Sequence, residues 1–213
     1  MSEVIALLDR GGVLMYPLLL LSVLALWIFL ERVYHLKRAD SKAALLFDEV
    51  RILLAEGKHE GAIRLARERP GPVAAVFYAL LRTPLTEKAD LEEVATIQGR
   101  TELQRLTRRL SFLSLIAGLA PLIGLLGTVI GMVKAFQAVA TSQGVVNPSL
   151  LAGGIWEALL TTVLGLTVAI PAYVFHHVLD QKVKAYAFQI NHYGTLLIQR
   201  LATTEDVHAG RGL

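Results

Sequence analysis

Residues 110–133 read LSFLSLIAGLAPLIGLLGTVIGMV, a run of 24 residues without a charged side chain. A helix rises about 1.5 Å per residue, so about 20 apolar residues cross the roughly 30 Å hydrocarbon core of a bilayer. Residues 13–30, VLMYPLLLLSVLALWIFL, form a second such run, and residues 150–179 form a third in which Glu157 is the only charged residue. The three runs predict an all-α membrane protein with three transmembrane helices.

The composition agrees with this class. Apolar residues make up 54% of the 213 residues and charged residues 18%, whereas charged residues are about 25% of a typical soluble domain. The absence of cysteine excludes a disulfide scaffold, a thiol nucleophile and a thiolate metal site. The six histidines have no metal-binding spacing, and no phosphate-binding glycine loop occurs. We therefore expect no enzyme activity, no cofactor and no metal site.

The distribution of Lys and Arg predicts the orientation, because the cytoplasmic flanks of membrane spans are enriched in positive charge. The residues before the first run include Glu3, Asp9 and Arg10, unlike the basic start of a signal peptide, so we interpret this run as a retained anchor. Only Arg10 and Lys134 flank the spans on one side. The other side has ten basic residues, namely Arg32, Lys37, Arg38, Lys42, Arg100, Arg105, Arg108, Arg109, Lys182 and Lys184. This asymmetry predicts an N-terminus outside the cell membrane and a C-terminus in the cytoplasm.

The expected organisation follows from the spans and this orientation. It comprises an outer N-terminus (1–12), a first transmembrane helix (13–33), a cytoplasmic helical domain (34–109), a second transmembrane helix (110–134), a short outer loop (135–149), a third transmembrane helix (150–179), and a cytoplasmic C-terminal helix and tail (180–213). Lys134, at the outer end of the second span, is expected to extend toward the lipid headgroups.

The cytoplasmic segment is predicted to be helical. Apolar spacing favours helices at 42–56, 59–67 and 73–81, with a break at the Pro70-Gly71-Pro72 sequence. Asp90 and Glu93 resemble a capping box for a long helix that is expected to continue without interruption into the second span. Between the first two runs, residues 31–109 carry 15 Lys and Arg against 12 Asp and Glu, which we interpret as solvated helix faces and not as a nucleic-acid surface.

Glycines form a stripe along the second span. Gly124, Gly127 and Gly131 recur at i, i+3 and i+7, and so share one helix face. In lipid, small residues allow another helix backbone to approach closely, so the stripe predicts tight helix packing. Pro121 in the second span and Pro171 in the third are assigned to the same packing role.

Glu157 is the strongest functional signal. An ionisable group within a span costs about 2.5–3.5 kcal/mol on insertion scales, so it normally faces a protein interior or a water path. At about 100° per residue, Thr161 lies about 40° around the helix from Glu157 and Thr162 about 140°. Hydroxyls and a carboxyl in an apolar helix suit a proton or hydrated-ion path. A protonated glutamic acid that only ties two helices together is the alternative. The adjacent His176 and His177 point about 100° apart and are interpreted as interfacial anchors and not as a proton relay.

Residues 120–136, APLIGLLGTVIGMVKAF, and 154–172, GIWEALLTTVLGLTVAIPA, closely resemble the two signature blocks of the ExbB/TolQ/MotA proton-channel family. With three spans and a modest cytoplasmic domain, the chain resembles the ExbB/TolQ branch of the family. Within that branch it is more similar to the ExbB type. Trp156 stands where the family usually has a small residue, and the two histidines stand near a common asparagine.

The resemblance implies a subunit of a motor in the bacterial inner membrane that is driven by the proton motive force. Several copies, typically five, would form a ring around the membrane helices of a single-span ExbD/TolR-like partner, coupled to a TonB- or TolA-like transducer for outer-membrane import or envelope maintenance. The N-terminus would then be periplasmic. Thr128 and Thr162 would line the pore, and Glu157 would lie near the interface of the second and third spans.

Other functions are kept open. A passive membrane scaffold or assembly factor would use the same helix packing without conducting protons, and a stator for surface motility is a further alternative within the family. A small-molecule transporter usually needs more spans or an inverted repeat.

Overall fold

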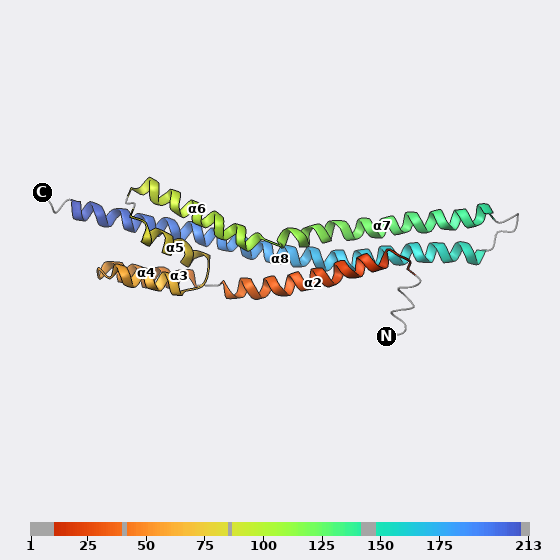
Figure 1. Ribbon diagram of the computed structural model, residues 1–213, viewed down its shortest axis with the longest axis horizontal. Coiled ribbons are helices and arrows are strands. Elements are labelled where there is room, and N and C mark those ends of the chain that lie inside the picture. The colour runs from red at the N-terminus through yellow and green to blue at the C-terminus, as the bar shows by residue number, and fades with distance from the viewer. Residues whose placement is uncertain (1–10, 40–41, 85–86, 142–147, 210–213) are drawn as a thin grey trace. The chain divides into compact units, whose positions relative to one another are not determined.

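The computed structural model describes residues 11–39, 42–84, 87–141 and 148–209. All regular structure within these ranges is helical (Figure 1). The helices are α2 (Met15–Arg38), α3 (Ala43–Ala55), α4 (His59–Glu68), α5 (Pro72–Arg82), α6 (Lys88–Thr107), α7 (Leu110–Thr141) and α8 (Pro148–Ala209). The chain divides into two compact units, each described separately below. The first unit comprises the residues up to Glu31 with Arg109–Val178, and the second comprises Arg32–Arg108 with the residues from Leu179.

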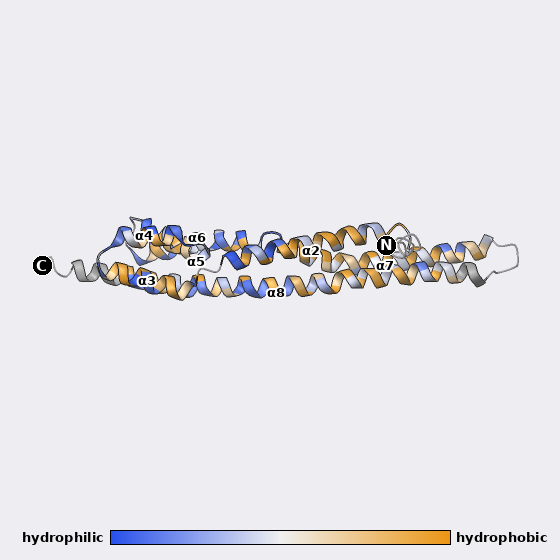
Figure 2. Cartoon of the chain, turned by 90° about the horizontal axis from the view of Figure 1, so that it is seen from below, coloured by the Kyte–Doolittle hydropathy of each residue, from blue (hydrophilic) through white to orange (hydrophobic). Residues whose placement is uncertain are grey.

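The first unit contains the apolar helices. Among the described residues, three helices are long and apolar enough to cross a membrane, in agreement with the predicted all-α class. Figure 2 shows their hydrophobic residues along α2 and α7. Only 22%, 28% and 33% of the most apolar windows in α2, α7 and α8 is buried within the chain. Most of this apolar surface therefore needs lipid or other protein helices to cover it.

Helix α7 continues to Thr141, past the predicted end of the second span at residue 134. Residues 135–141, AFQAVAT, contain no Gly or Pro to end the helix, so it extends into the segment expected to be a loop. Residues 142–147 of that segment lie outside the described residues.

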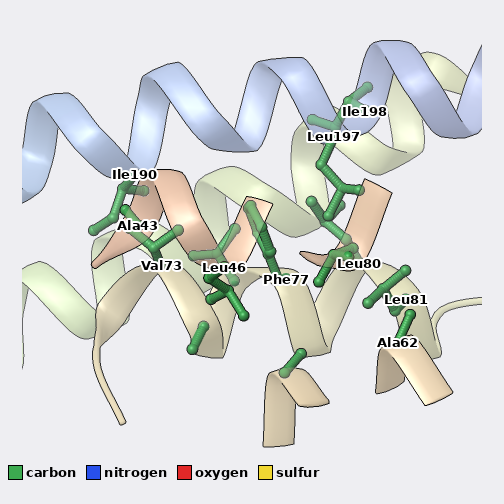
Figure 3. Packing of buried hydrophobic residues seen from close by; sticks show 14 of the residues in the cluster. Ala43, Leu46, Ala62, Val73, Phe77, Leu80, Leu81, Ile190, Leu197 and Ile198 are labelled. Carbon is green, nitrogen blue, oxygen red and sulfur yellow. The ribbon is translucent and has the colours of Figure 1, made fainter. Parts of the chain in front are cut away.

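The second unit has its own hydrophobic core. Leu46 of α3 and Phe77 and Leu80 of α5 are fully buried, and Figure 3 shows Ile190 and Leu197 of α8 beside them. The C-terminal half of α8 thus packs on the short helices. The core also includes Ala43, Val50, Ala62, Ala66, Val73, Ala74, Val76, Leu81, Leu91 and Ile198.

Polar contacts fix the ends of the short helices in this second unit. Arg69, just after α4, donates to both carboxylate oxygens of Glu49 in α3, at 3.1 and 2.9 Å. Nε2 of His59 in α4 lies 3.0 Å from the carbonyl oxygen of Leu81 in α5. These contacts tie α3, α4 and α5 together at their polar edges. The predicted helices at 42–56, 59–67 and 73–81 agree with α3, α4 and α5 to within a residue at each end.

The expectation of one unbroken helix from Asp90 into the second span is wrong. Helix α6 begins at Lys88, so Asp90 lies in its first turn and is not a cap, and α6 ends at Thr107. Arg109 then has φ of 74°, in the left-handed region, and α7 starts at Leu110. No Gly or Pro signals this break in the sequence. The Arg109 side chain is instead held by a tertiary contact, described below.

Candidate functional site

A seam of small residues joins α7 and α8 in the first unit. A Cβ added at Gly165 would lie 2.7 Å from the carbonyl oxygen of Ala120, and one at Gly131 would lie 2.8 Å from the Cβ of Ala158. Because a Cβ essentially never approaches so closely, these positions require glycine. The contacts run in opposite directions along the two helices, so α7 and α8 are antiparallel (Figure 1).

The predicted packing residues occupy different positions relative to this seam. Gly124, Gly127 and Gly131 are all buried in it. Pro121 lies within α7 and is half-buried beside the seam, whereas Pro171 lies within α8 and is exposed within the chain. Both helices continue through their prolines.

Two threonine hydroxyls of α8 meet one backbone carbonyl of α7. Thr162 donates to the carbonyl oxygen of Gly124 at 3.1 Å. Thr161 is 2% exposed, donates to the carbonyl oxygen of Ala158 at 2.7 Å and also lies 3.4 Å from that of Gly124. Glycine at 124 permits this, since a Cβ there would lie 3.1 Å from Thr162 Cα. The sequence had singled out Thr162, but Thr161 is the more deeply buried hydroxyl.

Glu157 lies on the opposite edge of the seam from Thr162. Its Oε1 accepts a hydrogen bond from Lys134 Nζ of α7 at 2.8 Å. Its carboxylate also lies against Gly12, in the turn before α2, where an added Cβ would overlap Oε1. Three parts of the first unit therefore converge on Glu157. The expectation that Lys134 extends away to the headgroups differs from the structure, in which its amino group binds this carboxylate.

Thr128 occupies a third position. Its hydroxyl donates to the carbonyl oxygen of Leu125 in its own helix at 2.6 Å. It also lines an open apolar hollow on α7 with Val129, Met132, Val133 and Phe136. Within the described residues, no hydrogen bond joins Thr128 to Thr162 or Glu157. The structure thus brings Thr162 to the Gly124 carbonyl and Glu157 to Lys134, whereas the Thr128 hydroxyl bonds within its own helix.

A second charged contact in the first unit lies at the start of α7. Arg109 Nη1 donates to Glu31 Oε1 at 2.6 Å, and its guanidinium lies over the Trp27 ring at 5.7 Å. The sequence pattern marked these residues only as separate span boundaries. A signal that could have indicated this contact is the opposite charge of Glu31 and Arg109, which stand at neighbouring ends of two spans. The adjacent His176 and His177 are half-buried and exposed, respectively.

The fold and these contacts define a multi-pass α-helical membrane protein with paired polar groups inside an apolar unit. Residues 68–192 match the model of the MotA/TolQ/ExbB proton channel family. The chain belongs to this family, and the resemblance seen in the sequence is confirmed.

Relatives with similar sequences cover most of the chain. The putative biopolymer transport protein ExbB-like 3 of Synechocystis sp. is 33% identical over 174 residues, which are 79% of this chain and 80% of the relative. The biopolymer transport protein exbB1 of Vibrio cholerae is 29% identical over 191 residues, 81% of this chain and 77% of the relative. A putative ExbB homologue of Methanothermobacter thermautotrophicus is 28% identical over 170 residues, and the match spans 79% of this chain and 60% of that relative.

Proposed function

We propose that this chain is a non-enzymatic proton-channel subunit of an inner-membrane complex that uses the proton motive force. The observation that carries the proposal is the pair of hydroxyls, Thr161 and Thr162, at the Gly124 carbonyl within an apolar unit of a proton-channel family member. A hydroxyl can donate one hydrogen bond while it accepts another. It can therefore extend a hydrogen-bonded path for protons without carrying a permanent charge.

The proposed complex is a ring of several copies of the chain, typically five, around an ExbD/TolR-like single-span partner. The exposed apolar face of α7 supports this arrangement, because the hollow that Thr128 lines is formed by residues of α7. A partner helix packed there would bring its polar group to Thr128. The N-terminus would be periplasmic and the C-terminus cytoplasmic. Proton passage would move the partner and energise a TonB- or TolA-like transducer.

The energy available per proton sets the scale of one step. One elementary charge that crosses about 100 mV releases about 2.3 kcal/mol. This is enough to break one or two ordinary hydrogen bonds, each of which contributes about 1 kcal/mol net. Repeated small steps around a ring of subunits therefore fit the energy better than a single large rearrangement.

The test begins with the native complex. Purification of the chain from its own membrane, followed by mass spectrometry, should identify a copurifying single-span protein with a membrane aspartate. The complex is then reconstituted in liposomes, and proton flux under an imposed potential is followed with a pH-sensitive dye. We expect Thr162→Val to reduce the flux at least tenfold. Thr167→Val is the matched control, because Thr167 is exposed and its hydroxyl donates to the carbonyl oxygen of Val163 in its own helix, at 2.7 Å. Equal flux in both variants would contradict the pore assignment.

A passive scaffold or assembly factor is the second candidate. The observation that favours it is the Lys134–Glu157 ion pair, which ties α7 to α8 as a structural contact would. Under this function the reconstituted complex, with its partner present, would show no proton flux above that of empty liposomes.

A further inference from the structure

We propose that Lys134 is a positioning residue for Glu157, which holds the carboxyl group in an ion pair on the edge of the α7–α8 seam away from Thr162. This inference deepens the proposed function: the role of Lys134 in proton movement rests on the chain being a proton-channel subunit. The contact itself, 2.8 Å between Lys134 Nζ and Glu157 Oε1, is independent of that function.

The seam of small residues brings the two charged positions together. Gly131 and Gly154 approach so closely that a Cβ on Gly131 would lie 2.9 Å from the Gly154 carbonyl oxygen. Lys134 follows Gly131 by three residues, and Glu157 follows Gly154 by three residues. Residues three apart lie on the same side of a helix, so both side chains emerge next to this close backbone contact. Their pairing is therefore a consequence of the helix register.

The two members of the pair differ in burial. The Glu157 side chain is 25% exposed and that of Lys134 is 55% exposed. The lysine side chain links α7 to α8 at the edge of the seam, while the acid is largely covered, partly by the turn at Gly12. A carboxylate in an apolar span is unfavourable without an opposite charge, and a nearby cation favours its ionised form. Lys134 supplies that charge.

The pairing has a consequence for proton movement. Glu157 and Thr162 lie about 140° apart around α8, on opposite edges of the seam. While Lys134 occupies Oε1, the carboxyl group stays directed to α7 and Gly12. Uptake of a proton by Glu157 neutralises it, weakens the attraction of Lys134 and frees the side chain. Lys134 thus sets when Glu157 can take part in the path.

The test measures the charge state of Glu157 directly, in the intact complex in native membranes. N,N′-Dicyclohexylcarbodiimide reacts with a protonated carboxyl group in an apolar environment to give a stable N-acylurea, which peptide mass spectrometry locates and quantifies. At neutral pH we expect Lys134→Met to increase labelling of Glu157 at least fivefold over the unsubstituted chain. Lys134→Arg keeps the cation and should label at the unsubstituted level.

The matched control is Lys184→Met, which removes a lysine from another ion pair, with Asp180 at 2.7 Å, in the part of α8 that belongs to the second unit. It should leave Glu157 labelling unchanged. Equal labelling in Lys134→Met and in the unsubstituted chain would overturn the proposal, whatever the flux experiment shows. Conversely, increased labelling with no proton flux in any variant would support the role of the ion pair and contradict the proposed proton-channel function.

A second measurement covers the case in which Lys134→Met does not accumulate. Lys134→Glu places two carboxylates together and should lower the yield of folded protein from the membrane. Combining it with Glu157→Lys restores opposite charges, and we expect the yield to return to at least half of the original. Failure of the exchanged pair to recover the yield would overturn the assigned contact.

Discussion

Thr162 on α8 donates its hydroxyl hydrogen to the backbone carbonyl oxygen of Gly124 on α7, at 3.1 Å. The same oxygen lies 3.4 Å from the Thr161 hydroxyl. A candidate pore residue and a packing residue therefore meet at one atom. Any change that separates the two helices also removes the hydrogen bond of Thr162, so helix packing and the position of the Thr162 hydroxyl are coupled at this point of the seam.

The seam predicts a large difference between two glycine substitutions. Gly165→Ala would place a Cβ 2.7 Å from the Ala120 carbonyl oxygen, so α7 and α8 must separate. Overpacking of this kind costs about 1–3 kcal/mol. Gly118→Ala is the control, since no atom lies within 4 Å of its added Cβ. Unfolding of detergent-solubilised protein, titrated with sodium dodecyl sulfate and followed by circular dichroism, should show a loss of stability only for Gly165→Ala. Equal stability of the two variants would contradict the seam.

The buried hydroxyl of Thr161 should stabilise the helix pair. Thr161→Val has nearly the same shape but loses the hydrogen bonds to the Ala158 and Gly124 carbonyl oxygens. We expect the free energy of unfolding to fall by about 1 kcal/mol, the usual net value of such a bond. Thr161→Ser keeps the hydroxyl and should recover part of the loss. A Thr161→Val variant as stable as the unsubstituted chain would show that this hydroxyl contributes nothing to packing.

Backbone conformation and side-chain pairing at Arg109 can be separated. Arg109→Ala and Arg109→Gly both remove the contacts with Glu31 and Trp27. Only glycine tolerates φ of 74° without strain, and the left-handed conformation costs other residues about 1–2 kcal/mol. We therefore expect Arg109→Gly to be more stable than Arg109→Ala by about 1 kcal/mol in the same unfolding titration. The reverse order would argue against the break between α6 and α7.

The second unit should depend on its aromatic core. Phe77 is fully buried and its ring centroid lies 6.3 Å from that of Phe47. Phe77→Ala should lower the free energy of unfolding by about 3–5 kcal/mol, because it removes a large buried side chain and leaves a cavity. Limited proteolysis of the α3–α6 region then becomes faster. Phe188→Ala is the control, since Phe188 is 68% exposed. Similar proteolysis rates for both variants would contradict the assigned core.

Local signals account for the helices that were predicted well. Gly57 and the Pro70-Gly71-Pro72 sequence break the chain where α3 and α4 end, so these boundaries follow from residues that cannot continue a helix. The break at Arg109 has no such residue. Its side chain contacts Glu31, 78 positions away in the sequence, and no local pattern contains that contact.

The candidate site also has a part that local signals predict and a part that depends on tertiary contacts. The sequence marked Glu157 and Thr162 because polar side chains are costly in an apolar span. It did not pair Glu157 with Lys134, and it undervalued Thr161. Both results depend on which residues of α7 face which residues of α8, and this register is absent from either helix alone.

The sequence by itself determined three uncharged or nearly uncharged apolar runs and the helical class, because hydropathy and helix length act locally along the chain. It also determined the family through two contiguous blocks of residues. Only the tertiary structure decided that Glu157 binds Lys134 and that two threonines share the Gly124 carbonyl. The physical reason is that close contacts between small residues fix the antiparallel register of α7 and α8, and that register selects the partner of each polar side chain.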